Sequence, residues 1–486
     1  MPRPDQPETA GKIVDVRGWI QRLSTSPKPL LKRVFGFHDE IFLADESVVL
    51  EIIRRVKEQC LRDDDQARLC SPRETAIGPF ARSSLASFRA IEELEKTCLP
   101  LWTRLLKWIC FAALIVAYLP IITLRTILMR VSRQAPLGEP AILSMANPGL
   151  AEETVREQFE GKPVSKVVSE PRYLGLREWR FLLRACMEAP GLLVRPMLMA
   201  NILRWLAVYG YLTRFRSPMA IVVTAERVVS MPLMTCFVRQ LGITHVNVMH
   251  GERLLTADGS FAVFDMNLVW GEHFRKLMLR QECPDYQFSI TGCPRHRHLF
   301  FGVRSQLPIP GRILVLFIPE MRPGTAAFRS FLDFAACLSP DWEVVVRPHP
   351  RYGQLLGQFM ESVLADNRSQ RTGFKLSSEN PLEVDPVRSL GQSSLAVSLL
   401  SSMMLEAWIA GRRVVYLDGG GNRQAVMARH GDSKRVIHMR DVRGQEHLKS
   451  FLTGEVEADQ REVDLINFVT SLKSSSAKCP ILKPLP

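Results

Sequence analysis

The sequence has ten cysteines, yet none of them form a Cys-x-x-Cys pair. They are scattered among apolar residues, as at Cys110, Cys186 and Cys337, a pattern typical of buried thiols in a reducing compartment. The first 97 residues open with a polar, proline-containing tail and lack the apolar core of a signal peptide. We therefore expect neither a disulfide-stapled secreted fold nor export by a cleaved signal.

Nucleic-acid-binding patterns are also missing: there is no zinc-knuckle, RNP-type or helix-turn-helix motif, and no internal repeat. The formal net charge of +13 nevertheless predicts a polyanionic partner. Without nucleic-acid motifs, phosphorylated small molecules and an anionic membrane surface are the favoured partners. With 46% hydrophobic residues, the 486-residue chain is globular and long enough for two or three domains.

From Pro140 onward, short apolar runs alternate with helical stretches, as in doubly wound α/β sheets. The region from 303 to 311 contains Pro308 and Pro310 and is predicted to be a linker between two such sets. We expect a helical region at 1–137, one Rossmann-like domain at 138–305 and a second at 306–486. The predicted strands are 141–145, 165–168, 220–224, 245–249, 267–270 and 288–291 in the first set, and 312–318, 343–346, 374–376, 395–400, 414–417 and 435–438 in the second.

The stretch Arg347-Pro348-His349-Pro350 follows the apolar run Val344 to Val346 in the second set. Ligands of open α/β sheets gather at the carboxyl ends of strands, where this stretch lies. Proline keeps the residue before it extended, so Arg347 and His349 are expected to project from the same side. Two hydrogen-bond donors are thus predicted at this strand end, although an ordinary solvated strand exit has the same sequence features.

A second stretch, Ser393 to Asp418, has the pattern strand, helix, strand. Ser401 or Ser402 is predicted to cap the helix and Gly411 to end it. Hydroxyls and free backbone N–H groups at a helix start form an anion site. Glu406, about one turn further along, has a carboxylate suited to a ribose, while a local ion pair is the simpler alternative.

In the first set, His250 follows the predicted strand 245–249, and Glu226 follows the strand 220–224. An unperturbed histidine has a pKa of about 6.5, which suits a general base. Both residues are candidate bases, Asp258 is a weaker one, and a structural role for His250 or a pair of Glu226 with Arg227 remains open. The acidic run at 63–65 follows a basic helix rather than a strand, so no metal site is predicted there.

An uncharged segment runs from Trp108 to Leu124 and contains Pro120. At 17 residues it is shorter than the roughly 20 needed to span a bilayer. Basic residues flank both ends, so a tilted span, an in-plane helix and a buried core helix all remain open. We expect attachment to an anionic membrane surface on the cytoplasmic face.

These motifs carry a resemblance to a family. R-P-H-P after a strand, and S-S opening a helix that contains Glu and ends at Gly, resemble the C-terminal halves of GT-B enzymes that build bacterial surface and capsular polysaccharides. That group includes polysialyltransferases, capsule Kdo transferases and CDP-glycerol glycerophosphotransferases. Residues 246–251, 268–271 and 291–295 are similar to motifs of their N-terminal halves, so the resemblance covers about residues 140–475.

The resemblance implies two facing Rossmann-like domains and a metal-independent glycosyltransferase. A nucleotide sugar would be the donor substrate, no further cofactor is needed, and a surface glycan or its lipid-linked precursor would be the acceptor. Arg347, His349, Ser401, Ser402 and Glu406 would bind the donor, and His250 or Glu226 would deprotonate the acceptor. Because such an acceptor is in the membrane, we expect the protein at the cytoplasmic face of the inner membrane, attached peripherally or by one span.

Two other functions fit the same motifs. A CDP-glycerol-type phosphotransferase would use a similar His and Ser arrangement but attack phosphorus. A non-catalytic, membrane-docked subunit of a polysaccharide assembly complex would share the fold alone. The acidic-acidic-Gly motif of polysialyltransferases is missing, so a sialic acid donor is not supported.

Overall fold

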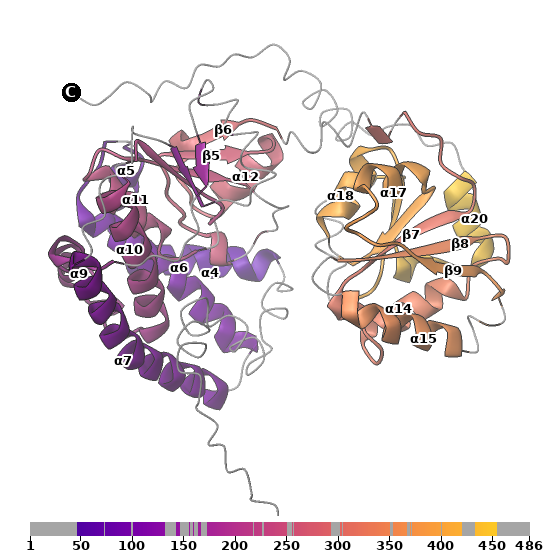
Figure 1. Ribbon diagram of the computed structural model, residues 1–486, viewed down its shortest axis with the longest axis horizontal. Coiled ribbons are helices and arrows are strands. Elements are labelled where there is room, and N and C mark those ends of the chain that lie inside the picture. The colour runs from indigo at the N-terminus through magenta and orange to yellow at the C-terminus, as the bar shows by residue number, and fades with distance from the viewer. Residues whose placement is uncertain are drawn as a thin grey trace, which may run out of the picture.

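The computed structural model shows two α/β halves side by side (Figure 1). The residues it describes are 46–71, 73–98, 101–131, 142–145, 155, 159, 164–166, 173–216, 218–225, 228–249, 255, 257–292, 302–303, 305–349, 353–366, 370, 372–399, 401–419 and 433–453.

The N-terminal half is built on a six-stranded parallel sheet in the order β2-β1-β3-β4-β5-β6. Its four inner strands are buried on both faces, which requires nearly continuous apolar runs and explains why the sequence marks them so clearly. The chain reverses its direction across the sheet between β1 and β3. The strands are β1 Ile142–Ser144, β2 Val164–Lys166, β3 Ala220–Val223, β4 Thr244–Val248, β5 Met266–Val269 and β6 Phe288–Ile290.

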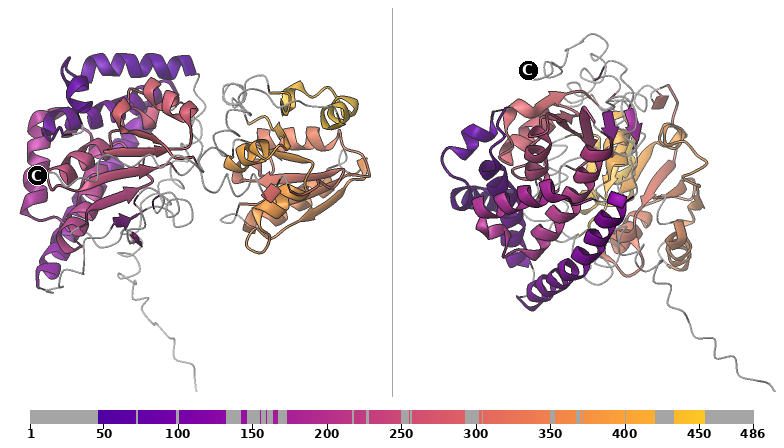
Figure 2. Two further views of the ribbon diagram at one scale, coloured as in Figure 1. Left: turned by 90° about the horizontal axis from the view of Figure 1, so that it is seen from above. Right: turned by 60° about the vertical axis from the view of Figure 1, so that its left-hand side comes forward.

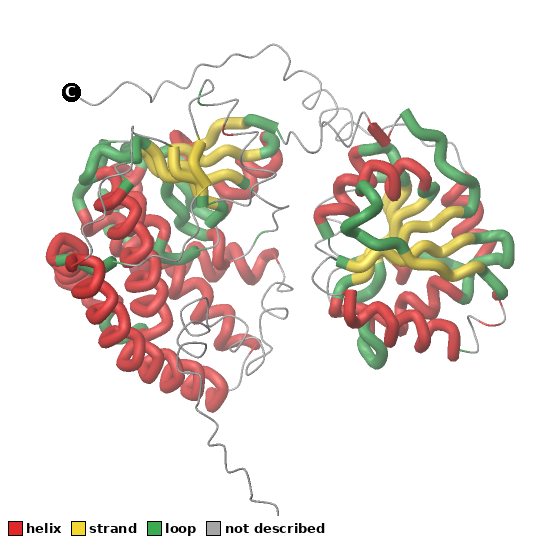
Figure 3. The backbone as a smooth tube through the Cα atoms, viewed as in Figure 1, coloured by secondary structure: helices red, strands yellow, loops and turns green. Residues whose placement is uncertain are grey.

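The C-terminal half repeats this plan in the order β12-β11-β10-β7-β8-β9, again all parallel, and reverses direction between β7 and β10. Helices cover both faces of the sheet (Figure 3). The strands are β7 Arg312–Phe317, β8 Glu343–Pro348, β9 Lys375–Ser378, β10 Leu395–Ser398, β11 Arg413–Tyr416 and β12 Val436–His438. On one face lie α14 Ala326–Ala335, α15 Leu356–Ala365 and α20 Gln445–Thr453, and on the other α17 Pro386–Gln392 and α18 Ser402–Ile409.

Two parallel, doubly wound sheets with helices on both faces fit a two-domain, Rossmann-like GT-B fold. The predicted fold class is confirmed to that extent. The predicted linker is held against the C-terminal half, because the Arg412 guanidinium donates to the carbonyls of Val303, Gln306 and Gly391 at 3.0, 2.8 and 2.9 Å.

The N-terminal helices share a core with the first sheet's helices instead of standing apart (Figure 2). Ser83 and Ser87 of α6 donate to the carbonyls of Phe261 and Ser260 at 2.7 and 2.6 Å. Arg82 of α6 pairs with buried Asp65 at 2.6 Å, so that carboxylate is committed to the fold. The helices are α4 Glu46–Cys60, α5 Asp65–Leu69, α6 Ile77–Cys98, α7 Leu101–Val131, α9 Leu176–Glu188, α10 Pro196–Phe215, α11 Met231–Arg239 and α12 Glu272–Arg280.

The uncharged segment lies inside α7, which packs along α10. Within the part of the chain that the structure describes, no helix has both the length and the apolarity needed to cross a bilayer. The helix predicted at 463–472 lies outside the described residues.

Candidate functional site at the carboxyl edge of the second sheet

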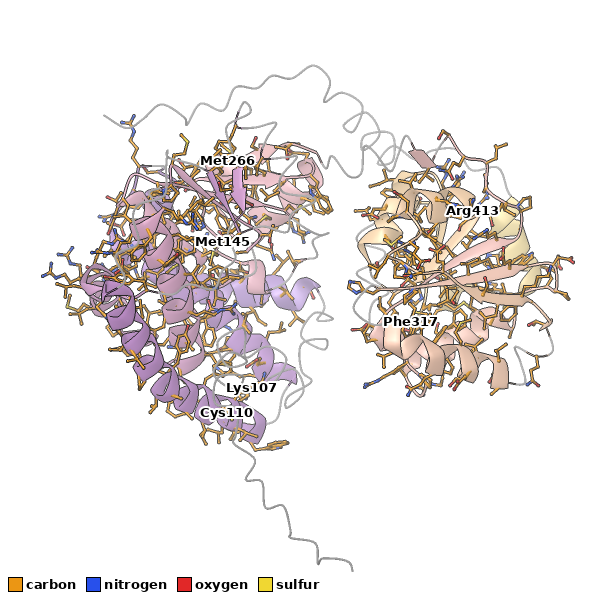
Figure 4. All side chains as sticks on the ribbon, viewed as in Figure 1. Lys107, Cys110, Met145, Met266, Phe317 and Arg413 are labelled. Carbon is orange, nitrogen blue, oxygen red and sulfur yellow. The ribbon has the colours of Figure 1, made fainter. Side chains whose placement is uncertain are left out.

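The reversal between β7 and β10 marks the edge where a ligand is expected, because loops diverge there and leave a crevice. Phe317, the last residue of β7, lies on the side facing the N-terminal half, and Arg413, the first residue of β11, lies further from it (Figure 4). The carboxyl edge of the second sheet therefore faces the first half.

Ser401 lies at this edge and begins α18 as predicted. Its backbone is extended, with φ −142° and ψ 147°, and its Oγ accepts from the backbone N–H of Met403 at 3.3 Å. Ser402 is the first helical residue, but its side chain is outside the description. Gly411 follows the end of the helix with φ +79°, a conformation that favours glycine. The cap uses the Met403 N–H, and the Met404 N–H donates to the Ser401 carbonyl at 3.1 Å, so α18 presents mainly the positive end of its dipole to this edge.

A second helix start at the same edge was not predicted. The loop after β7 ends at Gly324, whose φ of +88° favours glycine, and at Thr325, whose Oγ1 accepts from the Phe328 N–H at 3.1 Å. Thr325 thereby caps α14, which lies on the opposite face of the sheet from α18. Each helix start contributes a partial positive charge of roughly half a unit. The sequence signal was present, since Pro323-Gly324-Thr325 combines a turn with a capping residue.

His349 comes directly after β8, and its backbone N–H donates to the Phe317 carbonyl at 2.9 Å. Its side chain is exposed. Because β8 and β10 are both neighbours of β7, their carboxyl ends are about 10 Å apart. The sheet thus brings His349 and Ser401 to the same edge.

The Arg347 side chain is directed into the domain. Its Nη1 donates to Glu379 Oε1 at 2.7 Å and to Ser389 Oγ at 2.8 Å, and its Nη2 donates to the Pro381 carbonyl at 3.3 Å. The side chains of Arg347 and Glu379 are only 5% and 8% exposed. A phosphate could therefore reach Arg347 only by displacing protein acceptors from it. Glu406 is buried within α18 as well.

The two candidate bases, His250 and Glu226, lie outside the described residues, and the side chain of Asp258 is not described either. The strands that precede them are tied together. Asn247 of β4 accepts from the Ala225 N–H at 3.0 Å through Oδ1, and its Nδ2 donates to Asn267 Oδ1 at 2.9 Å. These buried amides fix the start of the loop after β3 against β4 and β5.

A buried polar network also anchors β4. The ring of His245 bonds Tyr209 Oη at 2.6 Å and Thr235 Oγ1 at 2.7 Å, and its backbone N–H donates to Asp265 Oδ2 at 2.6 Å. Asp265 also accepts from Arg239. Burial, and next the positive charge of Arg239, lower the pKa of His245 from 6.5 to about 3.

Acidification should therefore weaken the N-terminal half. Below pH 6.5 the unfolded chain protonates His245, whereas the folded chain does so only near pH 3. In that window this one group should lower the free energy of unfolding by about 1.4 kcal/mol per pH unit. Denaturant titrations across this range would measure the slope, with His245→Gln as the control that cannot titrate. Equal slopes for both proteins would contradict this expectation.

Metal-binding groups are not assembled in the described ranges, where no set of three His, Cys, Asp or Glu side chains is placed to hold an ion. The anion-binding features of the carboxyl edge are helix starts and an exposed imidazole.

The sequence matches no protein-family model and no curated protein sequence. Solved structures of similar fold include the UDP-GlcNAc 2-epimerase of Neisseria meningitidis bound to UDP-GlcNAc. It is 12% identical with a TM-score of 0.43, covering 69% of this chain and 98% of the epimerase. The wall teichoic acid polymerase TagF is 11% identical with a TM-score of 0.36, covering 77% of this chain and 94% of its own. The lipopolysaccharide outer core galactosyltransferase WaaB is 11% identical with a TM-score of 0.36, covering 68% of this chain and 94% of the galactosyltransferase. With identities this low and TM-scores below 0.5, these similarities support no conclusion about activity.

Proposed function

We propose that the protein is a glycosyltransferase that moves a sugar from a nucleotide-sugar donor onto a cell-surface polysaccharide or its lipid-linked precursor. The observation that carries the proposal is the pair of capped helix starts, α14 and α18, at the reversal of the second sheet beside exposed His349. Such an edge suits a diphosphate, whose charge grows as it leaves the sugar.

In this mechanism the positive end of the α18 dipole, the hydroxyls of Ser401 and Ser402, and His349 hold the donor phosphates. Glu406, which is only 2% exposed, orients the ribose only if the start of α18 moves on binding. Arg347 stabilises the same edge through its contacts with Glu379 and Ser389. It reaches phosphate only if its ion pair with Glu379 opens. These donors supply the positive field that a metal ion supplies in other transferases, so the reaction needs none.

On the acceptor side, His250 or Glu226 takes the proton from the acceptor hydroxyl as it attacks the sugar carbon. The bond from that carbon to the donor phosphate oxygen breaks, and the nucleotide diphosphate leaves. We place the reaction at the cytoplasmic face of the inner membrane, where a nucleotide sugar and a lipid-linked acceptor meet. The net charge of +13 and the exposed apolar face of α7 support this location.

Nucleotide binding should stabilise the C-terminal half. At 100 times its dissociation constant, a ligand of the folded state adds about 2.7 kcal/mol to the free energy of unfolding. Thermal unfolding with CMP, CDP, UDP and GDP and their sugar conjugates would identify the donor class. Ser401→Ala should reduce the shift, whereas Ser394→Ala, at the opposite end of β10, should not. If no nucleotide at millimolar concentration raised the melting temperature, the proposal would fail.

A further inference from the structure

Helix α7 exposes large apolar side chains and buries two polar ones, unlike a helix whose outer side faces water. Lys107 is 10% exposed and donates to Glu95 Oε1 at 2.8 Å, and Thr126 is buried, its Oγ1 accepting from the Leu174 N–H at 3.1 Å. By contrast Trp108 and Val116 are 51% and 72% exposed. Two polar side chains of α7 thus face the protein while large apolar ones are exposed, so something other than water is expected to cover the exposed side.

Helix α9 adds a second exposed apolar stripe. Leu176, Trp179, Leu183 and Met187 are spaced three and four residues apart, which places them on one side of the helix. All four are exposed, and Leu183 and Met187 reach 63% and 64%. Leu193 and Val194, just beyond α9, extend the stripe. This stripe and the exposed side of α7 belong to helices 45 or more residues apart in the sequence.

A groove joins the two helices. Its volume is about 740 Å³, and α7, α9 and α10 line it with apolar side chains that include Ile115, Leu119, Leu182, Cys186 and Leu203. Trp108 Nε1 donates to the Val194 carbonyl at 3.3 Å and so connects α7 to the turn before α10. The groove is thus continuous with the exposed side chains of both helices.

The exposed charges of α7 and α9 are mostly positive. Helix α7 has no acidic residue, and α9 exposes Arg177, Arg180 and Arg184 next to its apolar stripe. Of the two acids of α9, Glu178 is buried and accepts from the Gly175 N–H, whereas Glu188 at the end of the helix is 50% exposed and lies 3.8 Å from Arg82. Anionic headgroups are complementary to such a rim, and three tryptophans, Trp102, Trp108 and Trp179, suit the interface between headgroups and hydrocarbon.

We propose that α7 and α9 together dock the protein onto an anionic phospholipid bilayer, and that the groove between them takes one hydrocarbon chain of a lipid. The inference rests on the proposed function in one respect only: docking would bring the carboxyl edge of the second sheet close to lipid-linked acceptors, which only a transferase uses. The argument for a bilayer is charge complementarity, because α7 has no acidic residue and α9 exposes arginines along its apolar stripe, as in helices that lie on anionic membranes.

Flotation of the full-length protein with phosphatidylcholine vesicles, with and without phosphatidylglycerol, tests the surface. Leu183→Glu with Met187→Glu should weaken vesicle binding about tenfold or more, because two apolar side chains lose their burial in lipid. Leu364→Glu with Leu382→Glu makes the same change at exposed leucines of the C-terminal half and should have no effect. Arg180→Glu with Arg184→Glu should weaken binding to the anionic vesicles far more than to the neutral ones, and more so at low salt.

The groove is tested separately. Ala112 lines it and is only half-buried, so Ala112→Phe should fill it without disturbing the core. Phospholipid retained by protein recovered from vesicles, measured as organic phosphate, should fall severalfold in this variant. Leu364→Phe is the matched control, and its retained phosphate should equal that of the unchanged protein.

Three outcomes would overturn the inference: vesicle binding that survives Leu183→Glu with Met187→Glu, equal retention of lipid after Ala112→Phe, or lipid-independent self-association that those glutamates abolish. The last would make this face an interface between copies of the chain. Vesicle binding without any nucleotide-induced stabilisation would sink the proposed function while the docking surface stands.

Discussion

Replacing Arg347 with methionine should lower the free energy of unfolding of the C-terminal half by about 3 to 5 kcal/mol. The reason is that Glu379, whose side chain is only 8% exposed, would keep its charge but lose the partner that it contacts at 2.7 Å. Ser389 would lose its guanidinium contact at the same time. Denaturant unfolding followed by a probe in this half would measure the loss.

The matched control is Arg312→Met, at the amino end of the neighbouring strand β7. Arg312 and Glu343 are 3.8 Å apart and partly exposed, so breaking that pair should cost less than about 1 kcal/mol. Combining Arg347→Met with Glu379→Gln should recover much of the stability, because no buried charge then lacks a partner. Equal effects at Arg347 and Arg312 would show that the buried network contributes nothing.

His250→Ala should lower turnover by about 10² to 10⁴ while leaving nucleotide affinity nearly unchanged, since a base contacts only the acceptor proton. Calorimetric titration of the nucleotide and single-turnover rates would separate the two quantities. Glu226→Ala, measured in the same way, decides between the two candidate bases.

His349→Ala is the contrasting variant. A histidine that donates to phosphate contributes a charge-assisted hydrogen bond, so its loss should weaken nucleotide binding by about 1.5 to 3 kcal/mol. His447→Ala, far along the chain in α20, should change neither quantity. If His250→Ala weakened nucleotide binding as much as His349→Ala, His250 would belong to the donor site.

The strands were predictable because a parallel sheet covered on both faces demands apolar runs bounded by turn residues. β8 and β10 begin at Glu343 and Leu395, as predicted. β9 extends two residues past the predicted end, through Ser377 and Ser378. It is an edge strand, and its half-buried Ser377 and exposed Ser378 give no apolar signal.

The partners of charged residues could not be predicted in the same way. Arg347 contacts Glu379 and Ser389, which are 32 and 42 residues away in sequence. Nothing local to Arg347 distinguishes a guanidinium aimed at phosphate from one that supports a strand end. The sequence of α7 likewise left three alternatives open, and only the inward direction of Lys107 shows which side of the helix the protein uses.

Helix α6 cannot complete its contacts until much of the chain has been synthesised. Ser87 and the Ser260 carbonyl that accepts its hydrogen bond are 173 residues apart. At about 5 to 20 residues per second, α6 leaves the ribosome roughly 10 to 35 s before its acceptor is made. In that interval the side of α6 that contacts residues 257–261 lacks its partner, so we expect this side of the nascent helix to be exposed to chaperones or to a membrane surface.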